Sequence, residues 1–399
     1  MHQLTTLPRP LGRFIATFGH HIDRRLPGRH KGRIARLLGP QSGRYVSPEL
    51  GTTAALLSAF AESGIRYAII GSDDQAVPFL TPRLTVMVED EQVKAAGQLI
   101  SPWPAGEPIQ AFSPGGLPGF AFGDMPVLPT RLARRLLDGA TLTDGLCVAN
   151  PVDRFMASVF SIVYLRPSLI DADTDGVIKR SLSESIASQA GELDIQLSMP
   201  ITLGSLDALL MAHDWEPPID MQERIGCWNP WVADKLRRTG DWVGAEPAGL
   251  VVFYVRQKAI DEGKTELILN ELQRSGFRLL PAPSLTGAQL EAVGMEVRGG
   301  NWGRGPFPQS GGPPGAVVVA FDPNPIPPNQ TELKQFPLLD NSRIQQAKQS
   351  VRRAVHKDLP RAQHYNAMHS TDNAVQAWRA VREYYSAQEG ELRALIHDK

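Results

Sequence analysis

The sequence predicts an α/β (α+β) protein with two successive domains, and three observations support this fold class. The 399 residues are 42% hydrophobic, and 41 basic residues nearly balance 42 acidic ones, as in a folded globular chain of two or three domains. Helical and strand-like hydrophobic patterns alternate over residues 52–99 and again over residues 250–321. The stretch between them has mainly helical patterns. We therefore expect a helical layer in the first of two mixed domains.

The first 46 residues form a basic segment that differs from the rest of the chain. Nine of them are Lys or Arg against one acid, Asp23, so the segment carries +8 and the remainder −9. Apolar residues recur at helical spacing on both sides of Pro27-Gly28, which predicts two short amphipathic helices in an arm over residues 1–48. Such an arm can bind an anionic membrane surface or a partner protein, or it can pack on the next domain as a solvated helix pair.

Residues 49–240 are predicted to form the first domain. A helix beginning near Thr52 precedes strands at 67–72 and 84–89, and a helix follows at 91–99. Helical patterns return from residue 131, and the Gly- and Pro-containing stretch 237–247 is the predicted linker. Four Trp residues near the end of this domain are expected in a core or a domain interface: Trp215, Trp228, Trp231 and Trp242.

The Gly71-Ser72 turn after the first strand resembles the start of the nucleotidyltransferase-like fold, in which an Asp-x-Asp pair on the second strand holds Mg²⁺. Alternate residues share one face of a strand, so the equivalent pairs here are Arg83/Thr85 and Leu84/Val86. Neither pair is acidic, and the adjacent Asp73 and Asp74 point to opposite faces. The resemblance therefore implies a catalytically degenerate domain that recognises a sugar or nucleotide. An unrelated α/β domain with a tight turn is the alternative.

Residues 249–399 are predicted to form the second domain, in which elements of strand and helix alternate. An apolar strand covers 250–255, a helix covers 263–275, and strands cover 276–280 and 315–321. The segment 343–361 carries six Lys and Arg against one acid, and Thr371 or Asp372 can cap the start of a long helix. The order is β-α-β, loop, β, basic helices, and a histidine-bearing turn before the last helix.

Two motifs in this domain resemble the nucleoside diphosphate kinase family. Residues 254–260 (YVRQKAI) and 271–280 (ELQRSGFRLL) are similar to the family's opening strand, its Lys-Pro-Asp turn and its second strand. Residues 366–372 (NAMHSTD) are similar to Asn-x-x-His-Gly-Ser-Asp, whose His becomes phosphorylated, and Ser350-Val351-Arg352 stands where the family has Thr-Ile-Arg. The resemblance implies a ferredoxin-like fold with Mg²⁺ and a nucleoside triphosphate as ligand. The implied sites are His369 as nucleophile and, for nucleotide and phosphate, Arg256, Arg352, Asn366, Lys258 and Arg353.

This chemistry is consistent with the residue types present. A neutral imidazole is nucleophilic near pH 7 and can accept a phosphoryl group, while nearby cations neutralise the phosphate oxygens. The chain departs from the family pattern at several positions: Arg256 replaces a Lys, Ser370 a Gly, and Ala380 the Glu that orients the imidazole, with Glu383 as the nearest acid. A Gly- and Pro-rich stretch at 298–315 also replaces family structure.

Two functions therefore stay open. One is phosphoryl or nucleotide-dependent group transfer through His369, on a nucleotide sugar or glycan precursor. The other is a non-catalytic nucleotide- or phosphate-binding or scaffold protein of a polysaccharide or natural-product pathway. The near-zero net charge argues against a nucleic-acid partner, and no apolar run reaches 18 residues, so we expect a cytoplasmic or membrane-peripheral protein. Kinases of the family form oligomers, but the insertions and altered loops here give no basis for carrying this over, so the oligomeric state stays open; no protein metal site is predicted.

Overall fold

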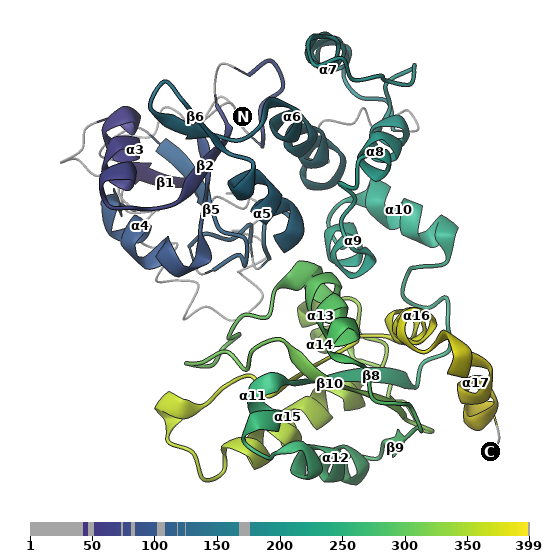
Figure 1. Ribbon diagram of the computed structural model, residues 1–399. Helices are drawn as coiled ribbons and strands as arrows, with labels where there is room; N and C mark the ends of the chain where they lie inside the picture. The colour runs from purple at the N-terminus through teal and green to yellow at the C-terminus, as the bar shows by residue number, and fades with distance from the viewer. Residues whose placement is uncertain are drawn as a thin grey trace. The chain divides into compact units, whose positions relative to one another are not determined.

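A computed structural model gives the architecture of the chain (Figure 1). It describes residues 43–46, 52–72, 75–80, 84–101, 108–117, 119–123, 125–166 and 176–397. The predicted helices of the basic arm, together with Asp73, Asp74 and Arg83, lie outside the described residues. Helices and strands alternate as expected, and the chain divides into two compact units, residues 1–216 and 217–399.

The first unit contains a mixed seven-stranded sheet in the order β4-β1-β5-β3-β2-β7-β6. Its central strands β2 and β3 pair antiparallel, whereas β3 with β5 and β2 with β7 pair parallel. The strand β1 lies inside the stretch 1–48 that was predicted as an arm. It forms by pairing with β4 and β5, which are more than fifty residues away in the sequence. The strands are β1 (Gly43–Val46), β2 (Tyr67–Gly71), β3 (Thr85–Val88), β4 (Ile100–Ser101), β5 (Pro108–Phe112), β6 (Thr141–Thr143) and β7 (Leu146–Val148).

Three helices of the first unit begin after a residue whose side chain accepts a hydrogen bond from a free backbone amide. Thr52 accepts a hydrogen bond from the Ala55 amide (3.2 Å), and Asn150 accepts one from Val152 (2.9 Å) before a helix with Pro at its first position. The helices are α3 (Thr53–Glu62), α4 (Val93–Leu99), α5 (Thr130–Asp138), α6 (Pro151–Phe160) with a π-helical turn at Ser161–Leu165, α7 (Arg180–Glu192) and α8 (Leu203–Ala212).

The second unit is built on a four-stranded sheet in the order β11-β8-β10-β9, and every neighbouring pair is antiparallel. The strands are β8 (Leu250–Arg256), β9 (Arg278–Leu279), β10 (Pro314–Phe321) and β11 (Met368–Ser370). The central strand β8 is buried along its whole length, which explains its continuous apolar run.

Two layers of helices cover this sheet (Figure 1). Val251, Phe253 and Val255 pack toward α12 (Thr265–Arg274) and α15 (Ser342–His356) on one face. The alternate residues Val252 and Tyr254 pack toward α13 (Gly287–Glu296), α16 (Ala374–Tyr384) and α17 (Glu389–His397) on the other. The remaining helices are α9 (Ile219–Gly226), α10 (Pro230–Thr239), α11 (Gln257–Asp261) and α14 (Gln330–Gln335).

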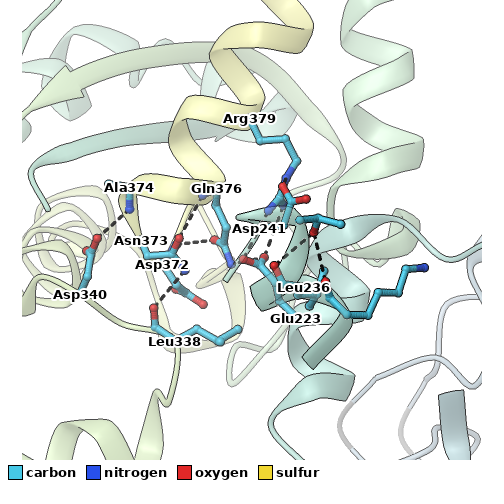
Figure 2. A network of polar contacts seen from close by, with 12 residues as sticks. Glu223, Leu236, Asp241, Leu338, Asp340, Asp372, Asn373, Ala374, Gln376 and Arg379 are labelled. Carbon is cyan, nitrogen blue, oxygen red and sulfur yellow. Dashed lines mark hydrogen bonds and ion pairs between the residues drawn. The ribbon is translucent and has the colours of Figure 1, made fainter. Parts of the chain in front are cut away.

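The division between the units falls about twenty residues before the predicted linker at 237–247, because helix α9 joins the second unit. Glu223 on α9 is buried and accepts a hydrogen bond from Gln376 Nε2 (2.8 Å) on α16, with Arg379 Nη2 3.5 Å from its other oxygen (Figure 2). Asp241 after α10 lies 3.5 Å from Arg379 Nε. Trp228, expected in a core or a domain interface, is 40% exposed.

Helix α16 begins one or two residues later than predicted, because its cap is Asn373 and not Thr371 or Asp372. Asn373 Oδ1 accepts from the Gln376 amide (3.0 Å), and Nδ2 donates to the Leu338 carbonyl (3.1 Å; Figure 2). Throughout the part of the chain that the structure describes, no helix is long and apolar enough to cross a membrane.

Candidate functional site

His369 lies at the middle of the edge strand β11, opposite Tyr254 of β8. The two rings stack with centroids 6.0 Å apart, and the edge of Trp302 meets His369 at 5.9 Å. Tyr254 is buried, and burial raises the pKa of its phenol well above the usual value, so it stays neutral. The half-buried imidazole is therefore held between two neutral aromatic rings.

Arg256 ends strand β8 and is only 2% exposed. Its guanidinium donates to backbone carbonyls of the Gly-rich stretch: from Nε to Gly312 (2.6 Å), from Nη1 to Gly303 (2.9 Å) and from Nη2 to Trp302. The Trp302 ring also lies against it, 5.3 Å from the guanidinium carbon. The residue predicted to bind phosphate thus holds a loop in this structure.

Asn366 lies between the two arginines of the predicted site. In one orientation of its amide, Oδ1 accepts from Arg352 Nη2 at 3.3 Å. In the other, Oδ1 accepts from Arg256 Nη1 (3.1 Å) and Nδ2 donates to the Met368 carbonyl (3.0 Å). We favour the second orientation because it makes two bonds instead of one. Asn366 then joins Arg256 to strand β11, and its amide faces Arg352.

Arg352 projects from α15 as a half-buried cation. Its Nε is buried and has no hydrogen-bond acceptor, and among the described residues no carboxylate pairs with its guanidinium. Burial lowers its pKa, and the Phe307 ring lies 5.5 Å from the guanidinium carbon. Because a buried charge is costly without a partner, this guanidinium has unused capacity to bind an anion.

Lys258 and Arg353, the other two predicted phosphate ligands, have different surroundings. Lys258 Nζ donates to Gln309, lies 3.9 Å from Glu262 and sits 4.9 Å from the centre of the Tyr365 ring. Arg353 is exposed. The pKa of Glu271 on α12 is lowered mainly by hydrogen bonds from Arg274 and Ser350, and the charge of Arg353 makes a smaller contribution. No described contact brings Arg353 to the other predicted site residues.

Two histidines, His356 and His364, lie beside Arg352, and His356 is only 9% exposed. Its ring stacks on His364 at 4.3 Å and meets Phe307 at 5.0 Å. His356 Nε2 lies 2.8 Å from the Tyr365 carbonyl oxygen, and burial lowers the pKa of the imidazole. His356 is buried because the turn after α15 folds back on the helix, a tertiary contact that no periodic pattern in the sequence indicates.

Glu383 is the acid nearest to the position of the family's orienting Glu. Its carboxyl is hydrogen-bonded to the Tyr384 side chain, and burial raises the pKa of this carboxyl. Within the described ranges no group of three or more His, Cys, Asp and Glu side chains could hold a metal ion. Sequence reasoning missed the loop residues Trp302, Phe307 and Gln309. Their only signal was the presence of aromatic side chains within a Gly-rich stretch.

The structure thus brings together Arg256, Asn366 and Arg352, and Trp302 connects this group to His369. No family model, no curated protein and no solved structure matches the chain. The chemistry of the cluster must therefore be argued from its own contacts.

Proposed function

We propose that the second unit binds a nucleotide or another phosphorylated small molecule at Arg352. The observation that carries the proposal is the half-buried guanidinium with an unbonded Nε and no paired carboxylate among the described residues. A guanidinium presents donors in a planar fork that suits two phosphate oxygens, and hydrogen bonds between ionised groups are stronger than neutral ones. A phosphate at this position would neutralise the buried charge.

The order of elements supports the same function. The succession β8, α12, β9, β10, α15, β11 is the β-α-β-β-α-β order of a ferredoxin-like fold. That is the fold of the nucleoside diphosphate kinase family, which the motifs around Arg256 and His369 resemble. By this resemblance, Arg352 stands at the family's phosphate-contacting Arg, and Mg²⁺ would come with the triphosphate as part of the ligand.

Calorimetric titration of the full chain with the four common nucleoside triphosphates, each with Mg²⁺, tests the proposal. We expect at least one to bind, and Arg352→Gln to weaken its binding at least tenfold. Arg353→Gln is the matched control, because it removes the same charge from the adjacent, exposed position of the same helix. Equal weakening by both variants would mean that only the general positive charge of α15 attracts the ligand, and absence of binding would reject the proposal.

A second candidate function, phosphoryl transfer, is favoured by the position of His369. The imidazole lies on β11 three residues after Asn366, half-buried between Tyr254 and Trp302. In this reaction a ring nitrogen attacks the terminal phosphorus, the bond from phosphorus to the bridging oxygen breaks, and the nucleoside diphosphate leaves with that oxygen. The phosphohistidine would then pass its phosphoryl group to an acceptor such as a nucleotide sugar or glycan precursor.

Incubation with γ-labelled triphosphate separates transfer from binding alone. Transfer predicts an acid-labile, alkali-stable label that is lost in His369→Ala and kept in His364→Ala. If the protein binds the nucleotide in the titration but takes up no label, the binding function stands and phosphoryl transfer is rejected. In that case a scaffold or sensor role in a biosynthetic pathway is the better proposal.

A further inference from the structure

Residues 302–312, here called the cap, contact every residue of the predicted ligand site except the exposed Arg353. The cap belongs to the Gly- and Pro-rich stretch and connects α13 and the 3-10 turn after it to β10. Its contacts are of three kinds: carbonyl groups on Arg256, aromatic rings on His369 and Arg352, and an amide side chain on Lys258.

The carbonyl contacts place neutral oxygen atoms where a phosphate is expected. Trp302, Gly303 and Gly312 each present a carbonyl oxygen to the Arg256 fork, and Ser310 Oγ lies 3.4 Å from Nη2. Three backbone oxygens around one guanidinium occupy the donors that would otherwise face phosphate oxygens. A carbonyl dipole is a weaker acceptor for this cation than a phosphate anion.

The aromatic contacts lie over the other two site residues. Trp302 meets His369 at 5.9 Å and donates from Nε1 to the Gly294 carbonyl (2.6 Å). Phe307 lies on both Arg352 (5.5 Å) and His356 (5.0 Å). The cap therefore covers the guanidinium of Arg352, whose Nε has no hydrogen-bond acceptor.

The third set of contacts fixes the end of the cap. The Gln309 side chain accepts a hydrogen bond from Lys258 Nζ and donates one from Nε2 to the Ala362 carbonyl (3.0 Å). The backbone N–H of Gln309 donates to the His364 carbonyl (3.2 Å). At Gly311 an added Cβ would lie only 2.0 Å from the Asn366 carbonyl oxygen, so only glycine allows this close approach.

We propose that the cap is an autoinhibitory strap, and that an incoming phosphate displaces its carbonyl oxygens from Arg256 and its Phe307 ring from Arg352. The inference rests on the proposed phosphate-binding function and adds its regulation. Gly300 and Gly312, both at positive φ near the ends of the cap, give the segment backbone freedom to swing outward. Only the fraction of molecules with an open cap can bind, so the closed state weakens the apparent affinity.

Two variants that loosen the cap test this inference in the full chain. Phe307→Ala removes the ring over Arg352, and Gln309→Ala removes the side-chain contacts to Lys258 and Ala362. We expect each to lower the apparent Kd for the bound nucleotide about tenfold. Phe336→Ala is the control, because Phe336 is a half-buried phenyl group that packs at the edge of the same unit's core.

Hydrogen exchange gives a second measurement on wild-type protein. Bound nucleotide should speed exchange at the Gln309 amide, which donates to His364 in the closed cap. If nucleotide binds but both cap variants leave the Kd unchanged and exchange does not rise, the cap is permanent structure and the inference is wrong, while the proposed function stands. If no variant and no wild-type protein binds nucleotide, the proposed function fails and the inference with it.

Discussion

Two buried charges of the second unit are compensated by protein groups and a third is not, and each case has a consequence that can be measured. Arg256 is surrounded by carbonyl oxygens of the cap. Glu223 is compensated by Gln376 and Arg379. Arg352 has neither arrangement among the described residues, which is why we assign the ligand to it while the cap holds Arg256.

Glu223 gives a prediction about pH. Burial raises the pKa of its carboxyl from 4.5 to about 7, although the charge of Arg379 opposes the shift. Between these values the folded protein holds a proton that the unfolded chain releases, so the contribution to stability is present below pH 4.5 and is lost as pH rises through 7. Glu223→Gln should therefore raise the free energy of unfolding at pH 8 by up to about 3 kcal/mol and change it little at pH 5.

Urea unfolding of both proteins at the two pH values measures this difference. Glu271→Gln is the control, because hydrogen bonds from Arg274 and Ser350 lower the pKa of Glu271 and give the opposite sign. Burial also raises the pKa of Asp340 to about 6, so some slope of the same sign should persist in Glu223→Gln. A loss of stability at pH 8 would contradict the assignment and mean that the ion pair with Arg379 outweighs burial.

At the scale of elements, helix α16 connects the candidate site to α9. Its cap Asn373 follows His369 by four residues and is fully buried, with one hydrogen bond to the helix and one to Leu338. Asn373→Ala should lower the free energy of unfolding by about 2 kcal/mol, because it removes a helix cap and leaves a buried carbonyl without its partner.

Asn329→Ala is the matched control in thermal or chemical unfolding. Asn329 also caps a helix through its side chain, accepting from Thr331 and Glu332, but it is exposed. We expect it to cost about 0.5–1 kcal/mol. Equal losses at both positions would show that the buried bond to Leu338 contributes nothing.

Elements with a strong local pattern could be predicted from the sequence, and those that depend on distant contacts could not. Strand β8 has a continuous apolar run, and α16 repeats Ala377, Trp378 and Val381 at helical spacing, so both were expected near their observed bounds. By contrast, β1 exists only through its pairing with β4 and β5. Helix α9 joins the second unit through the buried Glu223, which no local pattern reveals.

The candidate site shows the same division. The resemblance around His369 implied that Arg256, Asn366 and Arg352 serve one phosphate site, and Asn366 does lie beside both arginines, bonding one of them in each orientation of its amide. The cap could not be foreseen, since Gly- and Pro-rich segments have no periodicity that indicates where they fold. Its carbonyl oxygens change the role of Arg256 from an expected phosphate ligand to the anchor of a loop.

For the whole molecule, the second unit contains every residue of the candidate site and has its own core on both sides of the sheet, so the proposed ligand belongs to this unit. The first unit has a separate core beneath its seven-stranded sheet. The proposed binding of a phosphate therefore depends on one side chain, Arg352, and is best tested in the full chain of 399 residues.

Side-chain NMR of arginine-labelled protein tests this claim most directly. The Nε–H signal of Arg352, identified by its loss in Arg352→Lys, is followed while the nucleotide and Mg²⁺ are added. We predict that this signal shifts in step with the calorimetric binding curve, while the signal of the exposed Arg353 stays in place. A bound nucleotide that leaves the Arg352 signal unmoved would contradict the account.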